Sequence, residues 1–304
     1  MHPLHAAMFM TFCLAGYISY FVVQVNNDSS KRAPIEASNQ PDVSSRYDKI
    51  AKSFDKSVDT MELSMGMSKK RRNLVGQAHG DVLEVSIGTG RNLEYYNWDF
   101  KGSNGVGEVS TRGGVKKGKV QSFTAIDKSG EMLEIAHEKF STLFPGILGV
   151  RWIIGDASEE IPSPPKNANE RSGTWEGQKY DTVIQTMGLC SADDPVKLLR
   201  NLGECVKEEE GRILLLEHGR GKWDWVNKIL DKSAEGHANE HGCWWNRDIG
   251  EIVKESGLEI VNVETWHAGT TWKIELKKPA VKGLEVKEAQ DSIMETKIAK
   301  KLWW

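Results

Sequence analysis

Residues 80–92 carry the pattern with the clearest chemical meaning. An apolar run that contains Glu84 leads directly into Gly88-Thr89-Gly90, which predicts a strand that breaks into a glycine loop. Phosphate-binding loops need a third glycine or a Gly-Lys-Ser/Thr ending, but position 93 is leucine. A carboxylate on the strand before the loop would repel a pyrophosphate. It suits a ligand that carries an amino group and a sulfonium.

Acidic residues also end the next two predicted strands. Asp127 follows strand 122–126, and Asp156-Ala157 follow strand 150–154. Ligands of parallel sheets bind at the carboxyl ends of the strands, so we expect Asp127 to accept hydrogen bonds from two ribose hydroxyls. Such bonds contribute about 1.5–3 kcal/mol each. Asp156 and Ala157 are placed to contact the adenine edge, and Met132 to pack on its ring. A lone acid at a strand end is usually a helix cap, but three such acids favour a nucleoside ligand.

Further binding residues are expected around the loop. In the loop Gly88-Thr89-Gly90, the glycines would let the backbone approach the ligand, and the N–H groups near Arg91 and Asn92 suit a carboxylate. Gln185 and Thr186 end the fourth strand. Tyr47 and Phe54 lie on the apolar face of a helix, where they either pack in the core or cover the ligand. A dinucleotide oxidoreductase is the weaker alternative, because the third glycine is missing.

Strands and helices alternate along the rest of the chain, which predicts a doubly wound, mostly parallel α/β sheet with helices on both faces. Helical spacing covers 46–78, and 92–99 is expected to continue the first helix after the loop. The remaining predicted strands are 180–185, 212–217, 258–265 and 270–276, and the remaining helices are 129–144, 196–206, 223–238 and 248–256. The main domain spans 46–278, with insertions near 101–120 and 162–178 and a tail at 279–304.

The N-terminal segment has a different character. Residues 4–25 contain no formal charge and are rich in Phe, Leu, Met and Val. A helix of this length spans roughly 33 Å, enough for a hydrocarbon core of about 30 Å. A cleaved signal peptide is the alternative, but it would carry a basic n-region, and a transit peptide would be Arg-rich. We expect a single-pass membrane anchor in residues 1–25, joined by a polar linker, 26–45, to the main domain.

Composition excludes several classes of protein. The chain of 304 residues has 40 Lys and Arg against 43 Asp and Glu, a net charge of −3. Such a balance gives no electrostatic attraction for nucleic acid. The four cysteines, at 13, 190, 205 and 243, form no Cys-x-x-Cys pair, which argues against a disulfide framework and a zinc ribbon.

Together these motifs resemble one enzyme family. The matching segments are Arg46-Tyr-Asp-Lys-Ile-Ala-x-x-Phe-Asp55, Val82-Leu-Glu-Val-x-x-Gly-x-Gly-Arg-Asn92, Asp127-x-Ser-x-x-Met-Leu133, Gly155-Asp-Ala157, Tyr180-Asp-Thr-Val183 and Gly211-Arg-Ile-Leu-Leu-Leu-Glu-His-Gly-Arg220. This pattern resembles class I methyltransferases of the ubiquinone/menaquinone-biosynthesis type. Residues 223–250 are similar to a fungal family of methyltransferase-like proteins of the mitochondrial inner membrane.

The resemblance implies a seven-stranded Rossmann-like sheet, S-adenosylmethionine as cofactor and a mitochondrial inner-membrane location. The implied cofactor contacts are Glu84, Gly88, Gly90, Asp127, Met132, Asp156 and Ala157. A lipophilic small-molecule acceptor is expected, because an anchor keeps the site near the bilayer. Protein partners stay open. The alternative is a non-catalytic scaffold or assembly factor that retains the fold.

A general base is needed only for an acceptor that must lose a proton. His218 and Cys190 are the candidates, with Thr186 and Gln185 beside them. The spacing His237-x3-His241-x-Cys243 could hold a metal, but it shows no fourth ligand, so no metal site is expected. The pairs Trp223/Trp225 and Trp244/Trp245 line a substrate pocket, touch a bilayer or pack in the core. The C-terminal Lys300-Lys301-Leu-Trp-Trp304 either touches a membrane or frays.

Overall fold

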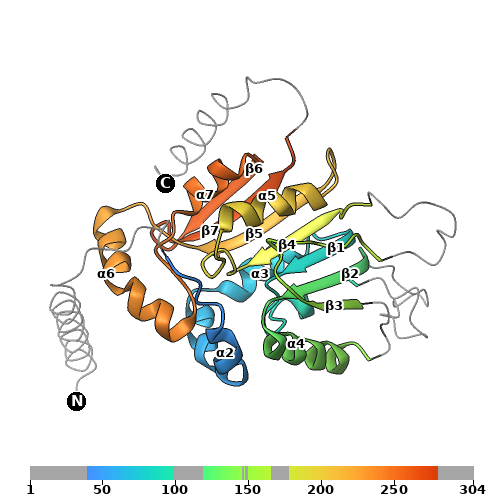
Figure 1. Cartoon of the computed structure of the whole chain (residues 1–304), viewed down its shortest axis with the longest axis horizontal. Helices are drawn as coiled ribbons and strands as arrows, with labels where there is room; N and C mark the ends of the chain where they lie inside the picture. The colour runs from blue at the N-terminus through green and yellow to red at the C-terminus, as the bar shows by residue number, and fades with distance from the viewer. Residues whose placement is uncertain (1–39, 99–118, 146, 148–149, 166–177, 280–304) are drawn as a thin grey trace, which may run out of the picture.

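Seven strands form one sheet in the order β3-β2-β1-β4-β5-β7-β6 (Figure 1). The computed structural model describes residues 40–98, 119–145, 147, 150–165 and 178–279. The strands are β1 (Gly80–Val85), β2 (Val120–Asp127), β3 (Val150–Ile154), β4 (Thr182–Thr186), β5 (Arg212–His218), β6 (Glu259–Trp266) and β7 (Thr271–Lys277). The first five run parallel, and β7 pairs antiparallel with both β5 and β6. The predicted seven-stranded, mostly parallel sheet is confirmed.

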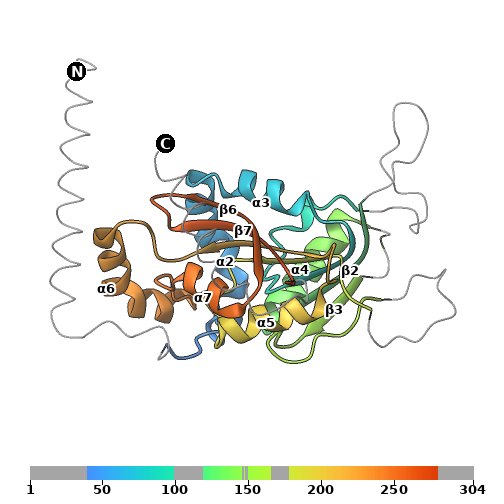
Figure 2. The same cartoon turned by 90° about the horizontal axis from the view of Figure 1, so that it is seen from above.

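Side-chain alternation along the strands builds two cores. On one face, residues such as Val82 and Ile184 pack against α3 (Met67–Val75) and α4 (Gly130–Leu143). On the other face, residues such as Leu83 and Val183 pack against α5 (Pro195–Cys205) and α7 (Ile249–Ser256). Figure 2 shows α3 and α5 on opposite sides of the sheet. Buried strands covered on both faces are what parallel sheets require.

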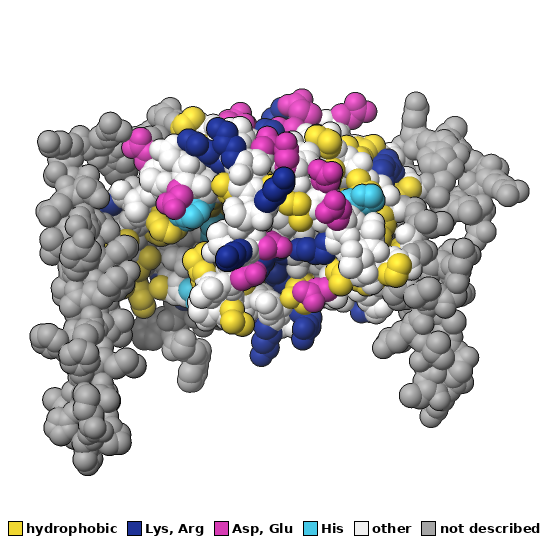
Figure 3. Space-filling view, turned by 90° about the horizontal axis from the view of Figure 1, so that it is seen from below, with side chains coloured by type: hydrophobic (Ala, Val, Ile, Leu, Met, Phe, Trp, Pro, Cys, Tyr) yellow, Lys and Arg dark blue, Asp and Glu magenta, His cyan; other side chains and the backbone are white. Residues whose placement is uncertain are grey.

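Two further helices lie outside these layers. Helix α2 (Arg46–Ser64) and helix α6 (Asp224–His241) contact each other beside the carboxyl ends of the parallel strands (Figure 1). On the face that Figure 3 shows, Lys and Arg side chains are interspersed with Asp and Glu side chains.

Short polar side chains fix where three of the helices begin. Ser129 accepts a hydrogen bond from the Met132 N–H at the start of α4, and Asp194 and Asp248 cap α5 and α7 in the same way. Each cap satisfies a backbone donor that has no partner inside its helix. Ser129 follows the end of β2, and Asp194 lies in the loop after β4. These two caps therefore also orient the chain at the cavity described below.

The helical spacing predicted over 46–78 is confirmed as two helices, α2 and α3, because the chain turns at Gly66, which has φ of +62°. One predicted element was wrong. Residues 92–99 do not continue a long helix: only Leu93–Tyr95 form a short 3-10 helix, η2. Trp98 ends this segment by packing among Tyr96, Phe123 and other aromatic rings. Burial of that ring requires an extended chain at Tyr96, which a continued helix would prevent.

Several predictions fall on parts of the chain outside the described residues. They concern the anchor at 4–25, the glycine-rich insertion at 101–120 apart from its last two residues, most of the 162–178 insertion and the tail after 279. Within the described ranges, none of the helices has the length and apolar character that crossing a membrane requires.

A cluster of buried polar side chains lies beneath the glycine loop. Glu84, on β1, is 1% exposed and accepts hydrogen bonds from Asn92 Nδ2 at 2.8 Å and from the Tyr96 hydroxyl at 2.6 Å. Arg71, on α3, donates to Asn92 Oδ1 at 3.1 Å and to Thr186 Oγ1 at 2.7 Å. The cluster therefore joins β1, β4, α3 and the segment after the loop through side chains alone.

Ion pairs continue this cluster toward α2. Arg71 also pairs with Glu62 at 2.7 Å. Arg91, the first residue after the loop, pairs with Glu62, Asp55 and Asp59 of α2 at 2.8–3.0 Å. The Glu62 and Arg91 side chains are only 12% and 17% exposed, so water screens this pair less than a surface pair. Helix α2 is thereby held against the loop.

Core packing gives a first prediction. Leu199 of α5 is fully buried between the helix layer and the sheet, whereas Leu63 of α2 is 78% exposed. Leu199→Ala should lower the free energy of unfolding by about 2–5 kcal/mol, because it leaves a cavity. Leu63→Ala should change it by less than about 0.5 kcal/mol. Urea denaturation of both variants checks this, and equal effects would contradict the described packing.

The buried cluster gives a second prediction. Burial raises the pKa of Glu84 from 4.5 to about 7, against the lowering effect of the Tyr96 and Asn92 hydrogen bonds and of the Arg71 charge. Because the folded-state pKa is raised, the stability that Glu84 contributes is complete below pH 4.5 and is lost as the pH rises through about 7. Relative to Glu84→Gln, the wild type should therefore lose about 3 kcal/mol between those pH values.

Urea denaturation of the wild type and Glu84→Gln between about pH 5 and pH 8 measures this difference. All other titrating groups are shared, so they cancel. Glu134→Gln, on the exposed side of α4, is the matched control and should follow the wild type at every pH. Parallel curves for the wild type and Glu84→Gln would contradict the raised pKa.

Candidate functional site

A cavity opens at the carboxyl ends of β1, β2, β3 and β4. Its lining includes seven of the residues predicted to bind a nucleoside cofactor: Tyr47, Gly88, Thr89, Asp127, Met132, Asp156 and Ala157. They come from α2, the glycine loop, the end of β2, the first turn of α4 and the loop after β3. Convergence of strand ends at one edge of a parallel sheet explains why residues so distant in sequence meet.

Asp127 is held in place by backbone donors. One carboxylate oxygen accepts from the Gly88 N–H at 2.8 Å, and the other accepts from the Ser129 N–H at 2.9 Å. Burial nevertheless raises the pKa of Asp127, because these hydrogen bonds only partly offset the loss of water. A carboxylate has about four acceptor positions, and these backbone donors do not fill all of them, so it can still accept from a diol in the cavity.

The glycine loop leaves room for a ligand. Gly88 has φ of +57°, and a Cβ added there would meet no protein atom within 4 Å. The loop can therefore lie directly against a bound molecule. Gly90 serves another purpose, since a Cβ there would lie 2.4 Å from Leu93 Cδ1. It lets the loop close onto the core.

Asp156 has a different electrostatic setting. It accepts from the Ser158 N–H at 2.8 Å and pairs with Lys128 at 3.1 Å. Burial opposes its charge, but these two partners outweigh burial and lower the pKa of Asp156. The carboxylate therefore stays ionised at the cavity edge, where it can accept a hydrogen bond from an exocyclic amino group.

Four predicted contact residues lie behind the cavity wall instead of lining it: Glu84, Gly90, Asn92 and Gln185. Glu84 and Asn92 hydrogen-bond to each other beneath the loop, so they support it from below. Gln185 is fully buried, and its amide atoms have no hydrogen-bond partner among the described residues. Strand-end position predicts which residues approach the site, but not which side of the strand each side chain takes.

Sequence reasoning missed several cavity residues. Arg71, Ser129, Ser191 and Met187 line the cavity. Ser129 was expected only as the first residue of helix 129–144. Its role as the N-cap could have been predicted, because a serine precedes an apolar helical pattern there. Arg71 lies in a run of four basic residues, so its burial against Glu62 carries no sequence signal.

A second cavity, of about 930 Å³, lies between α2 and α6. It shares four lining residues with the first: Tyr47, Phe54, Arg71 and Met187. Apolar atoms make up most of its exposed surface, with Val58, Met61, Met65 and Ile229 among its lining residues. Helix α6 also contributes charged side chains to the lining, among them Lys232, Glu235 and Glu240. The volume is typical of sites for drug-sized ligands.

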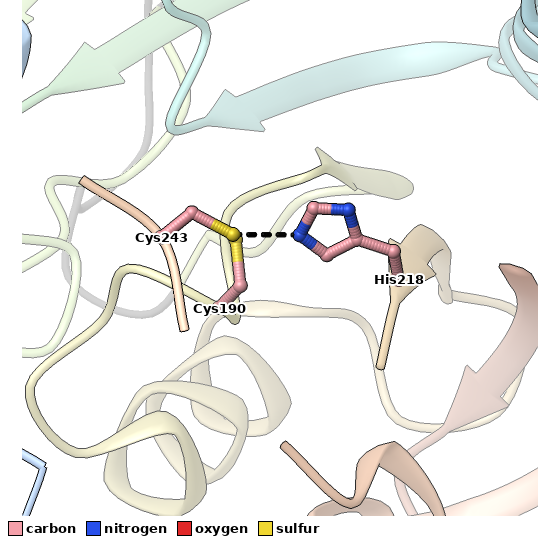
Figure 4. Close-up of side chains that lie close together, drawn as sticks. All are labelled: Cys190, His218 and Cys243. Atoms are coloured by element: carbon pink, nitrogen blue, oxygen red, sulfur yellow. Dashed lines mark hydrogen bonds between the residues drawn. The ribbon is translucent and has the colours of Figure 1, made fainter. Parts of the chain in front are cut away.

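The two residues predicted for proton transfer line this second cavity. His218 ends β5 and Cys190 lies in the loop after β4, and Cys243, just after α6, joins them (Figure 4). His218 Nε2 lies 2.8 Å from Cys243 Sγ. Contact with Cys243 and the His218 charge hold the pKa of Cys190 well below its usual range. Burial opposes the charge on His218, but Cys190 outweighs it and raises the pKa of His218.

A hydrogen-bonded path connects this group to the first cavity. The Cys190 and Ser191 side chains lie 3.5 Å apart, and the Ser191 hydroxyl is 2.8 Å from the Tyr47 hydroxyl. Burial and the neighbouring thiols raise the pKa of Tyr47 well above its usual value. Tyr47 therefore stays neutral and can donate at the boundary between the cavities.

The structure resolves two alternatives from the sequence. The His237 ring stacks on Trp245 at 3.9 Å and contacts the His241 ring, whereas Cys243 contacts His218 and Cys190. The three residues of the His237-x3-His241-x-Cys243 spacing therefore do not meet as one group of ligands. Trp244 is 3% exposed and packs in the core, and Trp245 lines the second cavity. Trp223 and Trp225 stack on each other and are 52% and 61% exposed, so neither packs in the core.

Comparisons with known proteins agree with this geometry. A family model for methyltransferase domains matches residues 62–263. The mitochondrial methyltransferase OMS1 of Saccharomyces cerevisiae is 39% identical over 238 residues, which are 78% of this chain and 46% of the yeast protein. The chain thus spans about half the length of this relative.

Solved structures show the same fold at low identity. A chain from the complex between the Haloferax volcanii Trm112 methyltransferase activator and a methyltransferase is 14% identical, with a TM-score of 0.51 over 77% of this chain and 98% of that one. A SAM-dependent methyltransferase from Thermotoga maritima is also 14% identical, with a TM-score of 0.50 over 78% of this chain and 100% of that one.

The glycine loop, the acidic strand ends and the family match lead to one identification. The chain belongs to the methyltransferase-domain family.

Proposed function

We propose that this chain is an S-adenosylmethionine-dependent methyltransferase, which transfers the methyl group of the cofactor to a small, lipophilic acceptor bound between α2 and α6. The observation that carries the proposal is the common wall of the two cavities, formed by Tyr47, Phe54, Arg71 and Met187. The first cavity offers the residues that suit the cofactor, and the second offers an apolar space next to it. A methyl group can pass between two ligands only if their sites adjoin in this way.

In the first cavity, we infer that Asp127 binds the ribose hydroxyls and Asp156 the adenine amino group, while Met132 packs on the adenine ring. Gly88 and Thr89 would lie along the cofactor. The open space above the Gly88 Cα and the remaining acceptor positions of Asp127 support this orientation. Glu84 and Asn92 then act by holding the loop, and Gln185 offers unpaired amide atoms behind the cavity.

Methyl transfer is a displacement at the sulfonium carbon, which the cofactor supplies when bound. The task left to the protein is to align donor and acceptor and to exclude water. Tyr47, Phe54 and Met187 stand at the boundary where the methyl group would cross. Apolar and aromatic side chains there would desolvate the acceptor and favour the compact transition state.

An acceptor that is lipophilic agrees with the expected membrane anchor at residues 4–25. We propose that this segment attaches the enzyme to the mitochondrial inner membrane. Support comes from the uncharged 22-residue run in the sequence and from the word mitochondrial in the name of the yeast relative. An anchored domain samples the membrane surface, where apolar acceptors concentrate.

Cofactor binding provides the test. Calorimetric titration of S-adenosylhomocysteine into the full-length chain, purified in mild detergent, should show one site. Asp127→Asn should weaken binding by about 1.5–3 kcal/mol, roughly 10- to 150-fold, because charged hydrogen bonds to the ribose are lost. Asp248→Asn is the matched control, since asparagine also caps helix α7 and Asp248 lies outside both cavities.

The pH dependence sharpens this test. The pKa of Asp127 is raised by burial, and the ionised form is the better acceptor, so affinity in the wild type should fall as the pH drops toward that pKa. Asp127→Asn should lack this fall. A folded wild type that binds no S-adenosylhomocysteine would contradict the proposed cofactor orientation and favour the scaffold alternative. Equal affinity of Asp127→Asn and the wild type would contradict the role of Asp127.

A further inference from the structure

We propose that Cys190, His218 and Cys243 form a zinc site whose open fourth position faces the acceptor cavity. The ligand atoms of these residues, two thiol sulfurs and an imidazole nitrogen, all lie within 4.8 Å of one another. The three residues are far apart in the sequence and reach this point from the loop after β4, the end of β5 and the turn after α6 (Figure 4). Their location in the acceptor cavity rests on the proposed function.

The donor set fits zinc. Zinc binds cysteine sulfur at about 2.3 Å and histidine nitrogen at about 2.0–2.1 Å in a tetrahedral arrangement. This places two sulfurs about 3.8 Å apart and a sulfur and a nitrogen about 3.6 Å apart. The observed spacing is compatible after small side-chain rotations, which would open the 2.8 Å separation of His218 Nε2 and Cys243 Sγ.

Three protein ligands with an open position are typical of catalytic zinc sites, and structural sites have four. In the part of the chain that the structure describes, no fourth acidic, cysteine or histidine side chain joins the group. All three residues line the cavity between α2 and α6, so the open position is accessible to a bound molecule. An acceptor that presents a hydroxyl or thiol could bind there through its oxygen or sulfur.

The backbone around the ligands is held rigidly. The Trp244 N–H donates to the Cys190 carbonyl at 3.0 Å, which ties the two cysteine segments together. Arg247 donates to the Leu189 and Ala192 carbonyls on either side of Cys190, both at 2.6 Å. Cys190 is 1% and Cys243 is 4% exposed. Support of this kind is what positions metal ligands before the metal arrives.

This site differs from both sequence-based expectations for these residues. The sequence spacing around His241 predicts no metal site, and His218 and Cys190 are the sequence-based candidates for proton transfer. A bound zinc ion would occupy the lone pairs of His218 and Cys190, so these side chains would orient the acceptor through the metal instead of accepting its proton. The substrate class narrows to lipophilic molecules with a hydroxyl or thiol at the methylated position.

Metal titration tests the proposal. The full-length chain, reduced and stripped with a chelator, is titrated with zinc chloride against a chromophoric zinc indicator. One equivalent should bind. Cys190→Ser, His218→Ala and Cys243→Ser should each weaken zinc binding at least about tenfold, because losing a ligand costs more than losing an outer partner. Cys205→Ser and His237→Ala are matched controls and should bind zinc as the wild type does.

Cobalt substitution tests the wild type without relying on a variant that folds. Cobalt in this site should give the intense visible bands of a tetrahedral complex and a thiolate charge-transfer band in the near ultraviolet. No stoichiometric zinc binding, or zinc binding that survives all three ligand substitutions, would overturn the proposal. So would a Cys190–Cys243 disulfide in the reduced preparation, seen as a loss of two hydrogens by mass spectrometry, or a preference for copper(I) over zinc.

Titration of S-adenosylhomocysteine into the metal-free chain separates this proposal from the proposed function. The three ligands do not line the cofactor cavity, so cofactor binding should persist without zinc. Cofactor binding that is retained in a chain without zinc binding would overturn only the proposed zinc site. Loss of cofactor binding in a folded chain that holds zinc would instead contradict the proposed function.

Discussion

The buried carboxyl group of Glu84 is the interaction on which the cofactor site depends. It accepts hydrogen bonds from Asn92 and Tyr96, and Asn92 is in turn bound by Arg71. A buried polar group without partners costs about 1–3 kcal/mol or more. The hydrogen bonds among these four side chains therefore depend on one another. Their formation fixes the distance between β1 and the segment that returns from the glycine loop.

The same cluster links the cofactor cavity to the acceptor cavity. Arg71 lines both and is held by Glu62, which also pairs with Arg91 beside the loop. Helix α2 is therefore fixed relative to the glycine loop, and Tyr47 and Phe54 are fixed with it. These two rings separate the space that suits the cofactor from the apolar space beside α6. Donor and acceptor sites are thus aligned by one network of charges and hydrogen bonds.

Much of this arrangement could be predicted from the sequence. The apolar strands, the acidic strand ends and the caps at Ser129, Asp194 and Asp248 are local patterns, so the order of strands and helices in the main domain followed from periodicity. The side of the strand that Glu84 and Gln185 occupy was not predictable in this way, because a fully buried strand shows no polar alternation. The extended chain at Tyr96 accompanies the packing of Trp98 against Phe123, which is distant in the sequence. Cys190, His218 and Cys243 meet only through tertiary structure, and their spacing in the sequence gives no metal-binding motif.

Hydrogen–deuterium exchange of the full-length chain, with and without S-adenosylhomocysteine, tests the central claim most directly. A cofactor bound at the strand ends should slow exchange in three separate segments: the glycine loop at 86–92, the start of α4 at 127–133 and the loop at 155–158. Exchange in the antiparallel pair β6 and β7 should stay unchanged, since both strands lie at the far edge of the sheet. Protection confined to α6, or absent from the glycine loop, would contradict the account.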